Sequence, residues 1–251
     1  MISRRLIVPL VTAATLTVYA LSAGQGVVKQ MTGPLNTNCY LLIDDDSREA
    51  AIVDAGGPLD SLSAVIQRQS LKVKYLLITH CHPDHLEGLQ ALVRLYPDAR
   101  LAVSKSEYDN FNGYARWSET FAPALVASWK KRPRLIELMD FDYQSVGEAD
   151  IVLADNMGLM LGQSEIRVYL TPGHTQGSVS FAFHDVVCVG DLLLYHGDGF
   201  LESDFSDQEA LNRAVARLYE ELPESTRILS GHGPSSTIAV EMRQNRKHKV
   251  K

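Results

Sequence analysis

Short apolar runs of β-strand composition alternate along the chain with segments whose apolar residues recur at helical spacing. The runs 38–44 and 50–54 flank the polar turn 45–49, a pattern that predicts an antiparallel hairpin. Further strands are expected at 72–79, 100–104, 165–171, 178–184, 186–190 and 227–230. Because helical segments separate these strands, the pattern predicts an α/β fold or a layered α+β fold.

Three segments have the apolar spacing of amphipathic helices. The first covers residues 59–70, and the second places Leu89 and Val93 on its buried face. The third begins at Ser206-x-x-Glu209, which has the form of a capping box. The order strands, helix, strand, helix occurs twice, which indicates two similar halves without a sequence repeat.

Residues 105–147 are the least regular part of the chain. They contain both tryptophans and a basic break, Lys130-Lys131-Arg132-Pro133. We expect helical excursions and loops over the core in this region.

The first thirty residues have the profile of a targeting segment. Arg4 and Arg5 precede the stretch from Leu6 to Val28, which carries no charge. This profile predicts that residues 1–25 are a signal peptide or a signal anchor, which places the protein in the periplasm, outside the cell or at a membrane. A mitochondrial presequence and an internal start of translation are the alternatives.

The remaining chain divides into one domain, 26–245, and a basic tail, 246–251. The tail is expected to be solvated, with a contact to an anionic membrane or a partner as the alternative. A length of 251 residues is enough for one substantial core. The sequence leaves the oligomeric state open.

Composition narrows the classes of function. Hydrophobic residues make up 45% of the chain and charged residues 22%, which is typical of a globular protein. The net charge of −6 argues against a nucleic-acid partner, because phosphate recognition needs clustered cations. Three cysteines are too few for a disulfide scaffold.

The candidate chemistry is concentrated in Thr79-His80-Cys81-His82-Pro83-Asp84-His85, which lies between a predicted strand and a predicted helix. His80 and His82, two apart on extended backbone, can turn toward one metal ion, while Asp84 and His85 can reach a second. Zinc binds such nitrogen and oxygen donors. Alternation points Cys81 away from the metals, so we expect it to pack in the core.

Three later segments add ligand candidates at the ends of predicted strands. His174, in Thr171-Pro172-Gly173-His174-Thr175, offers a third imidazole for the first metal, and Asp191 offers a carboxylate that can bridge both. His232 follows the last strand in Ser230-Gly231-His232-Gly233. Ligands in α/β layouts gather at the carboxyl ends of strands, so these residues are expected to converge.

The succession of AIVDAGG, HCHPDH, PGH, GD and GHG resembles the metallo-β-lactamase superfamily over about residues 27 to 245. The resemblance implies a four-layer αββα sandwich of α+β class, with a dinuclear site at one edge. By position, His80, His82 and His174 would hold the first metal, and Asp84, His85 and His232 the second, with Asp191 bridging them. Asp54 would be the strand-end aspartate that orients the histidine loop.

Within the superfamily, the stretches THCHPDHLEG and TPGHTQGSVSF look most like the short form of hydroxyacylglutathione hydrolase, or glyoxalase II. The presence of Asp191 argues against true β-lactamases, which usually lack that aspartate. Two departures weaken a glutathione thioester as the substrate. Only 19 residues follow His232, which leaves no room for the C-terminal helical domain of the longer enzymes, and Leu201-Glu202 replaces a Gly-Arg pair typical of short relatives.

The expected mechanism is hydrolysis of an acyl thioester such as S-lactoylglutathione. Two Zn²⁺ ions, with iron or manganese as alternatives, would supply a hydroxide nucleophile at neutral pH, and Asp84 or Asp191 would pass the proton to the leaving group. The alternatives are a lactonase or other ester hydrolase, a persulfide dioxygenase-like enzyme, and a non-catalytic metal-binding protein built on the same fold.

Overall fold

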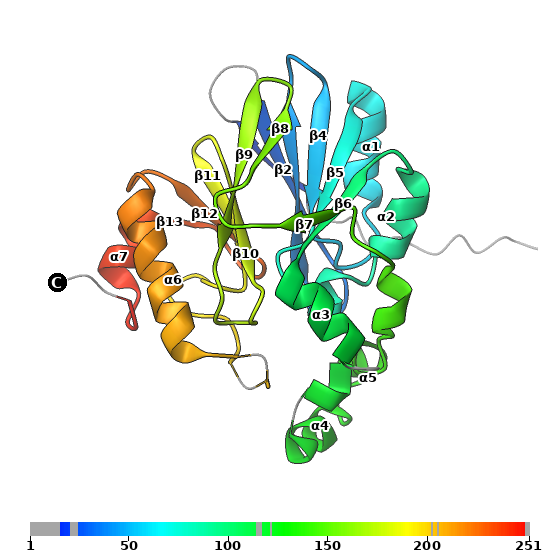
Figure 1. The fold of residues 1–251 in the computed structure, drawn as a ribbon, viewed down its shortest axis with the longest axis vertical. Helices are drawn as coiled ribbons and strands as arrows, with labels where there is room; N and C mark the ends of the chain where they lie inside the picture. The colour runs from blue at the N-terminus through cyan, green and yellow to red at the C-terminus, as the bar shows by residue number, and fades with distance from the viewer. Residues whose placement is uncertain are drawn as a thin grey trace, which may run out of the picture.

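The computed structural model describes residues 16–20, 25–113, 117–120, 122–201, 203–204 and 206–248. Two β-sheets lie face to face with helices on both outer sides (Figure 1). The four-layer α+β sandwich expected from the resemblance is therefore confirmed.

Within the described residues, the first sheet has seven strands in chain order. They are β1 (Leu16–Ala20), β2 (Gln25–Thr32), β3 (Thr37–Asp44), β4 (Glu49–Val53), β5 (Lys72–Leu77), β6 (Arg100–Ser104) and β7 (Ile151–Leu153). The predicted hairpin is β3 and β4, which pair antiparallel with Tyr40 opposite Val53. From β4 to β7 the strands run parallel, so their carboxyl ends meet at one edge.

In the part of the chain that the structure describes, the second sheet has six strands in the order β13-β12-β11-β10-β9-β8. They are β8 (Gly158–Leu161), β9 (Ser164–Leu170), β10 (Val179–Phe183), β11 (Val186–Gly190), β12 (Arg227–Ser230) and β13 (Ser236–Thr237). Strands β1, β2, β7, β8 and β13 were not predicted from the sequence. At two to four residues each, β7, β8 and β13 are too short to show a clear alternation of apolar and polar positions, and β1 lies in the segment expected to be a signal.

The helices divide between the outer faces. The first sheet is covered by α1 (Asp60–Gln69) and α2 (Leu89–Leu95), and the second by α6 (Gln208–Glu221) and α7 (Ile238–Gln244). Between α2 and β7, the region expected to be irregular contains α3 (Lys105–Gly113), η2 (Trp117–Thr120), α4 (Pro123–Trp129), α5 (Pro133–Met139) and η3 (Tyr143–Val146). Helices α4 and α5 extend away from the sheets (Figure 1).

Alternate residues of one strand contribute to two different cores: the inner core between the sheets and an outer core between a sheet and its helices. In β4, Ala51 and Val53 face the second sheet, whereas Ala50 and Ile52 pack toward α1 and α2. This explains why the strand is apolar at consecutive positions. The inner core between the sheets includes Phe181, which is fully buried.

Two local expectations are wrong. Val93 is 41% exposed and Leu92 is the buried residue, because α2 begins only at Leu89, after a separate 3-10 turn. The N-cap of α6 is Asp207, not Ser206: the Asp207 carboxylate accepts from the backbone N–H groups of Glu209 and Ala210.

Part of the predicted targeting segment is described. Leu16–Ala20 forms β1, which pairs antiparallel with β2 so that Val18 lies opposite Val28. Residues 1–15 and 21–24 lie outside the described residues, and the signal remains a prediction. Within the described chain, no helix combines the length and apolar character needed to span a bilayer.

The predicted basic tail is partly docked on the domain. Lys247 and His248 place their side-chain nitrogens 3.0 and 2.6 Å from the carboxylate of Asp198, and the His248 side chain is only 6% exposed. The His248 side chain is therefore not solvated as expected, whereas the Lys247 side chain remains 56% exposed. Residues 249–251 lie outside the described residues.

Candidate metal centre

The histidine-rich loop lies where β5 ends and the chain reverses. His82 has extended backbone, and Pro83 then occupies the first position of the 3-10 turn η1 (Pro83–His85), which its fixed φ favours. The change from extended to turned backbone separates the directions of the side chains on the two sides of Pro83. His82 therefore joins one group of ligand candidates, and Asp84 and His85 join another.

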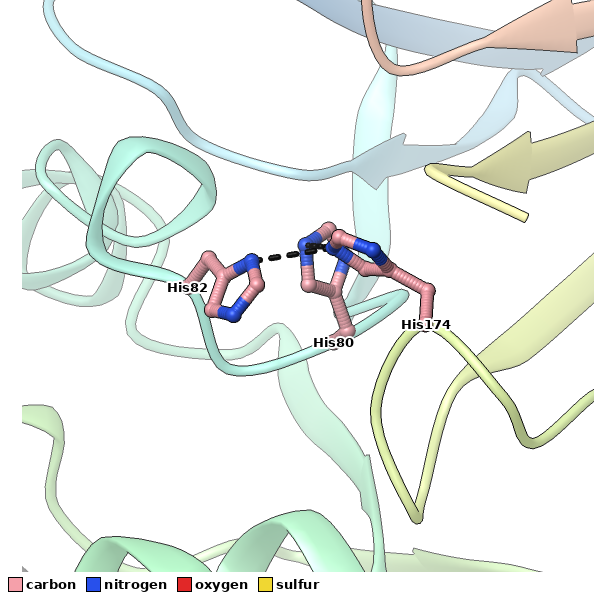
Figure 2. A group of neighbouring side chains, drawn as sticks. All are labelled: His80, His82 and His174. Carbon is pink, nitrogen blue, oxygen red and sulfur yellow. Dashed lines mark hydrogen bonds between the residues drawn. The ribbon is translucent and has the colours of Figure 1, made fainter. Parts of the chain in front are cut away.

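Three imidazoles form the first group (Figure 2). His80 and His82 come from the loop after β5, and His174 comes from the loop after β9. The Nε2 atom of His174 lies 3.1 Å from Nε2 of His80 and 2.9 Å from Nδ1 of His82. Tetrahedral zinc with bonds near 2.0–2.1 Å places its nitrogen ligands about 3.3 Å apart, so this spacing suits one ion.

Asp84, His85 and His232 form the second group. The Oδ2 atom of Asp84 lies 3.1 Å from Nε2 of His232 and 3.5 Å from Nε2 of His85. Asp84 and His85 are buried, whereas the His232 side chain is 24% exposed. The second group therefore lies on the more open side of the centre.

Asp191 lies between the two groups. Its Oδ2 atom is 3.4 Å from Nε2 of His232 and 3.8 Å from Nε2 of His174, and its Oδ1 atom is 3.7 Å from Nε2 of His85. This single carboxylate is within reach of ligands from both groups, as a bridging residue must be. The structure thus brings together all seven side chains that the sequence singled out.

Hydrogen bonds between the sheets hold the ligand loops in place. The hydroxyl group of Tyr40 in β3 donates to the carbonyl of Ser230, 2.7 Å away, at the start of the His232 loop. The backbone N–H of Val179 donates to the carbonyl of Thr79, next to His80. The first bond joins strands of different sheets, and the second joins β10 of the second sheet to the loop after β5 of the first, so the centre depends on how the two sheets pack.

Asp54 orients His85 from behind. The residue directly follows β4 and has a left-handed backbone with a φ of 60°. Its carboxylate accepts from the N–H and the hydroxyl of Thr79 at 2.9 and 2.8 Å, and it lies 2.8 Å from Nδ1 of His85. With Nδ1 engaged by Asp54, Nε2 of His85 is directed toward Asp84 and Asp191.

The imidazoles fall into two sets according to the direction in which their pKa values are shifted. Burial and neighbouring histidines lower the pKa of His80 well below its usual value and that of His82 to about 3. Burial also lowers the pKa of His174. These three rings are neutral near pH 7, so their lone pairs are available to a cation.

The two carboxylates and the other two imidazoles instead have pKa values shifted in favour of their charged forms. Burial alone would raise the pKa of Asp84 and Asp191, but the nearby histidines lower both. Burial alone would lower the pKa of His85, yet Asp84 and Asp54 raise it to about 10. In the absence of a cation, a proton on His85 balances these carboxylates.

Unsatisfied buried atoms indicate that the centre fits metal ions. Nε2 of His85 and Oδ1 of Asp191 are buried, and among the described residues neither has a hydrogen-bond partner. Leaving such groups unpaired costs about 1–3 kcal/mol each. Because both atoms face the middle of the cluster and are of types that divalent metals bind, the residues present fit such ions.

Glu107 supports the centre and was not found from the sequence. This fully buried side chain in α3 accepts from the N–H of Cys81 at 2.6 Å, and from the Thr175 hydroxyl and the Gly177 N–H at 2.7 Å each. It thereby joins the loop of His80 and His82 to the loop of His174. Cys81 itself lies in the outer core, as expected.

A cavity of about 410 Å³ opens onto the centre and contacts five of the seven side chains. Its other walls are Leu35, Trp129, Arg132, Leu135, Leu194 and Phe200. Trp129 comes from α4 and Leu135 from α5, so the irregular region supplies one wall. The cavity gives a small molecule access to the ligand cluster.

Comparison with known proteins identifies the family to which the chain belongs. A model of the family described as "Metallo-beta-lactamase superfamily" matches residues 32–232. The probable metallo-hydrolase YqgX of Bacillus subtilis (strain 168) is 31% identical over 222 residues, which cover 85% of this chain and 92% of the relative. The hydroxyacylglutathione hydrolase GloC of Haemophilus influenzae is 27% identical over 210 residues, covering 83% and 91%.

A solved structure agrees with these sequence matches. The crystal structure of the BLEG-1 B3 metallo-beta-lactamase superposes with a TM-score of 0.72 at 29% identity, covering 89% of this chain and all of the other. The similar proteins thus include one named as a hydroxyacylglutathione hydrolase and one named as a B3 metallo-beta-lactamase.

Proposed function

The chain belongs to the metallo-beta-lactamase superfamily and has the fold of its metal-dependent hydrolases, and we propose that it hydrolyses an acyl thioester at a centre of two zinc ions. The observation that carries the proposal is the convergence of His80, His82 and His174 beside Asp84, His85 and His232, with Asp191 between them. Seven donors are more than one zinc ion binds in a structural or catalytic site.

The residues have separate tasks in the proposed mechanism. His80, His82 and His174 would hold one ion, and Asp84, His85 and His232 the other. When bound, the two ions would supply a hydroxide from water near neutral pH and polarise the substrate carbonyl. Asp84 or Asp191 would carry the proton from this water to the departing thiolate.

The position of the cysteines relative to the cavity argues against a cysteine nucleophile. Cys39, Cys81 and Cys188 are buried, and burial raises the pKa of each thiol. None of them lines the cavity. Thiolate attack on the substrate is therefore disfavoured, and hydrolysis by an activated water is the chemistry that the centre supports.

The relatives and the set of ligand residues support a thioester as the substrate. The relative in Haemophilus influenzae is named a hydroxyacylglutathione hydrolase, which cleaves a thioester. Asp191, which lies between the two groups, accords with the glyoxalase II resemblance. A lactone or other ester is the second candidate, because the apolar side chains that line the cavity suit an uncharged acyl group.

The experiment is thiol release from a panel of acyl thioesters, S-lactoylglutathione included, by protein loaded with zinc, iron or manganese. We expect metal-dependent turnover that is lost in His82→Asn. The matched control is His184→Asn, an exposed histidine with a φ of 54° that asparagine tolerates. Metal-loaded protein that is inert toward every thioester and lactone would refute the proposal, and oxygen uptake with a persulfide would replace it with a dioxygenase.

We also propose that residues 1–25 direct export or membrane anchoring. The uncharged stretch after Arg4 and Arg5 supports this. N-terminal sequencing of the protein from cell fractions tests it: a mature start near residue 24 in the exported fraction is expected, and an intact Met1 in the soluble cell interior would contradict it.

A further inference from the structure

The cavity beside the ligand cluster has apolar walls from three separate parts of the chain. Leu35 comes from the turn after β2, Trp129 and Leu135 from α4 and α5, and Leu194 and Phe200 from the loop after β11. The rings of Trp129 and Phe200 lie 5.7 Å apart at 51°, so two of these parts meet over the cavity. Walls of this kind favour a hydrocarbon group over a polar one.

A cationic groove, referred to below as the outer groove, adjoins this cavity. The groove, of about 680 Å³, shares Leu35, Arg132 and Leu135 with the inner cavity and adds Lys131 to its lining. Both Lys131 and Arg132 are exposed. No described residue forms an ion pair with either cation, so their charges are available to a ligand.

The cavity and the groove together form two compartments, one apolar and one cationic. They suit a substrate that has an apolar part and an anionic part. Apart from Arg132 and the ligand candidates, the side chains that line the cavity beside the ligand cluster are apolar, and Arg132 also lines the neighbouring groove. A guanidinium group there is suited to a carboxylate or a phosphate, to which it can donate two hydrogen bonds at once.

We infer that the substrate is an amphipathic thioester whose apolar acyl group fills the inner cavity and whose thiol carries an anionic group bound by Arg132 and Lys131. The inference rests on the proposed hydrolase function. In the reaction, water forms a new carbon–oxygen bond at the carbonyl, the carbon–sulfur bond breaks, and the thiolate takes a proton. A thiol over the outer groove leaves toward solvent, while the carboxylic acid leaves the cavity afterwards.

Binding of a non-hydrolysable pair of thioethers tests the anion site without turnover. The pair is 3-(octylthio)propanoate and 2-(octylthio)ethanol, which share the alkyl chain and differ in the carboxylate. Calorimetry on the metal-loaded protein is expected to show about tenfold tighter binding of the acid, because a charge-assisted hydrogen bond contributes about this much. Equal affinity for the two compounds would overturn the inference.

Variants of Arg132 test whether this residue causes the preference for the acid over the alcohol. Arg132→Met is expected to remove the preference for the acid, and Arg132→Lys to retain part of it. The control is Arg94→Met, an exposed arginine on α2 that lines neither compartment. A preference that survives in Arg132→Met, or that disappears equally in Arg94→Met, would place the anion elsewhere.

Turnover of a chain-length series tests the apolar cavity. Acetyl and hexanoyl thioesters of 3-mercaptopropionate differ by four methylenes, each contributing up to about fourfold in binding. We expect kcat/KM to be at least about tenfold higher for hexanoyl, and Trp129→Ala to reduce this ratio more than Trp129→Leu.

The two sets of results separate the inference from the proposed function. Thioether binding with the predicted preference, but no hydrolysis of any thioester, would support the two compartments and refute the thioesterase. Hydrolysis that is indifferent to chain length and charge would support the thioesterase and overturn the compartments.

Discussion

The carboxylate of Glu107 accepts a 2.6 Å hydrogen bond from the backbone N–H of Cys81, the residue that separates His80 from His82. The same carboxylate accepts from Thr175 and Gly177, which follow His174. One buried side chain in α3 thus fixes the spacing between the two loops that supply all three imidazoles of the first group.

Replacing Glu107 by glutamine should weaken metal binding. An amide cannot accept on both sides as a carboxylate does, so at least one of the buried donors loses its partner. We expect about 10- to 100-fold lower affinity for the first metal, the usual effect of losing such support, measured by competition with a chromophoric chelator.

The control for this variant is Glu165→Gln, on the exposed side of β9. A structural role alone would lower thermal stability without changing metal affinity once the protein is folded. Unchanged affinity in folded Glu107→Gln would therefore contradict the role assigned to Glu107.

Gly231 should tolerate no side chain. A Cβ atom at this position would overlap Oδ1 of Asp191 and lie 2.7 Å from Cε1 of His85. We expect Gly231→Ala to displace one of these side chains and to lose about one metal equivalent per chain. In Gly197→Ala, where no atom lies within 4 Å of the added Cβ, metal content should remain that of the wild type. Full metal content in both variants would show that Gly231 does not lie against the centre.

Metal binding should release protons near pH 7. Although burial opposes it, Asp84 and Asp54 raise the pKa of His85 to about 10 in the metal-free protein, so the ring is protonated at neutral pH. Coordination requires the neutral ring. Metal affinity should therefore fall as the pH decreases.

Calorimetric titration of the metal-free protein with zinc in two buffers of different ionisation enthalpy measures this release. We expect about one proton or more per chain. A binding enthalpy that is the same in both buffers would mean that His85 is already neutral.

The C-terminal contact should stabilise one wall of the cavity. His248 pairs with Asp198, two residues before Phe200, and the Asp198 side chain is fully buried. We expect His248→Ala to lower the free energy of unfolding by about 1–3 kcal/mol, because it leaves a buried carboxylate with one partner fewer. Urea denaturation measures this loss.

The control is Arg246→Ala, which removes an exposed cation in the same segment. It should change the free energy of unfolding by less than about 0.5 kcal/mol. Equal effects of the two substitutions would contradict a specific contact.

The ligand cluster was predictable because its residues follow strand ends and are unusual in turns. Imidazoles at 80, 82 and 85 within one short segment have no common structural reason, and His174 and His232 stand beside glycines after later strands. The parallel order of β4 to β6 then brings strand ends together without further information from side chains.

Contacts over long sequence separations were not predictable. Glu107 is one glutamate in an irregular region, and its partners lie 26 to 70 positions away. Arg132 and Trp129 have the composition of a surface loop, and only the folded chain places them beside the ligands. The Asp207 cap was missed because its neighbour Ser206 is an equally good capping residue, whose hydroxyl instead donates to the carbonyl of His174.

The number of metal ions bound per chain is the most direct test of a dinuclear centre. Elemental analysis by mass spectrometry of protein purified without chelators should give about two equivalents of divalent metal. His174→Asn should lose an ion from the first group while His85 and His232 still hold the second. Wild-type protein that remains metal-free after dialysis against zinc, iron or manganese would contradict the account, since the seven side chains would then have gathered without a cation to bind.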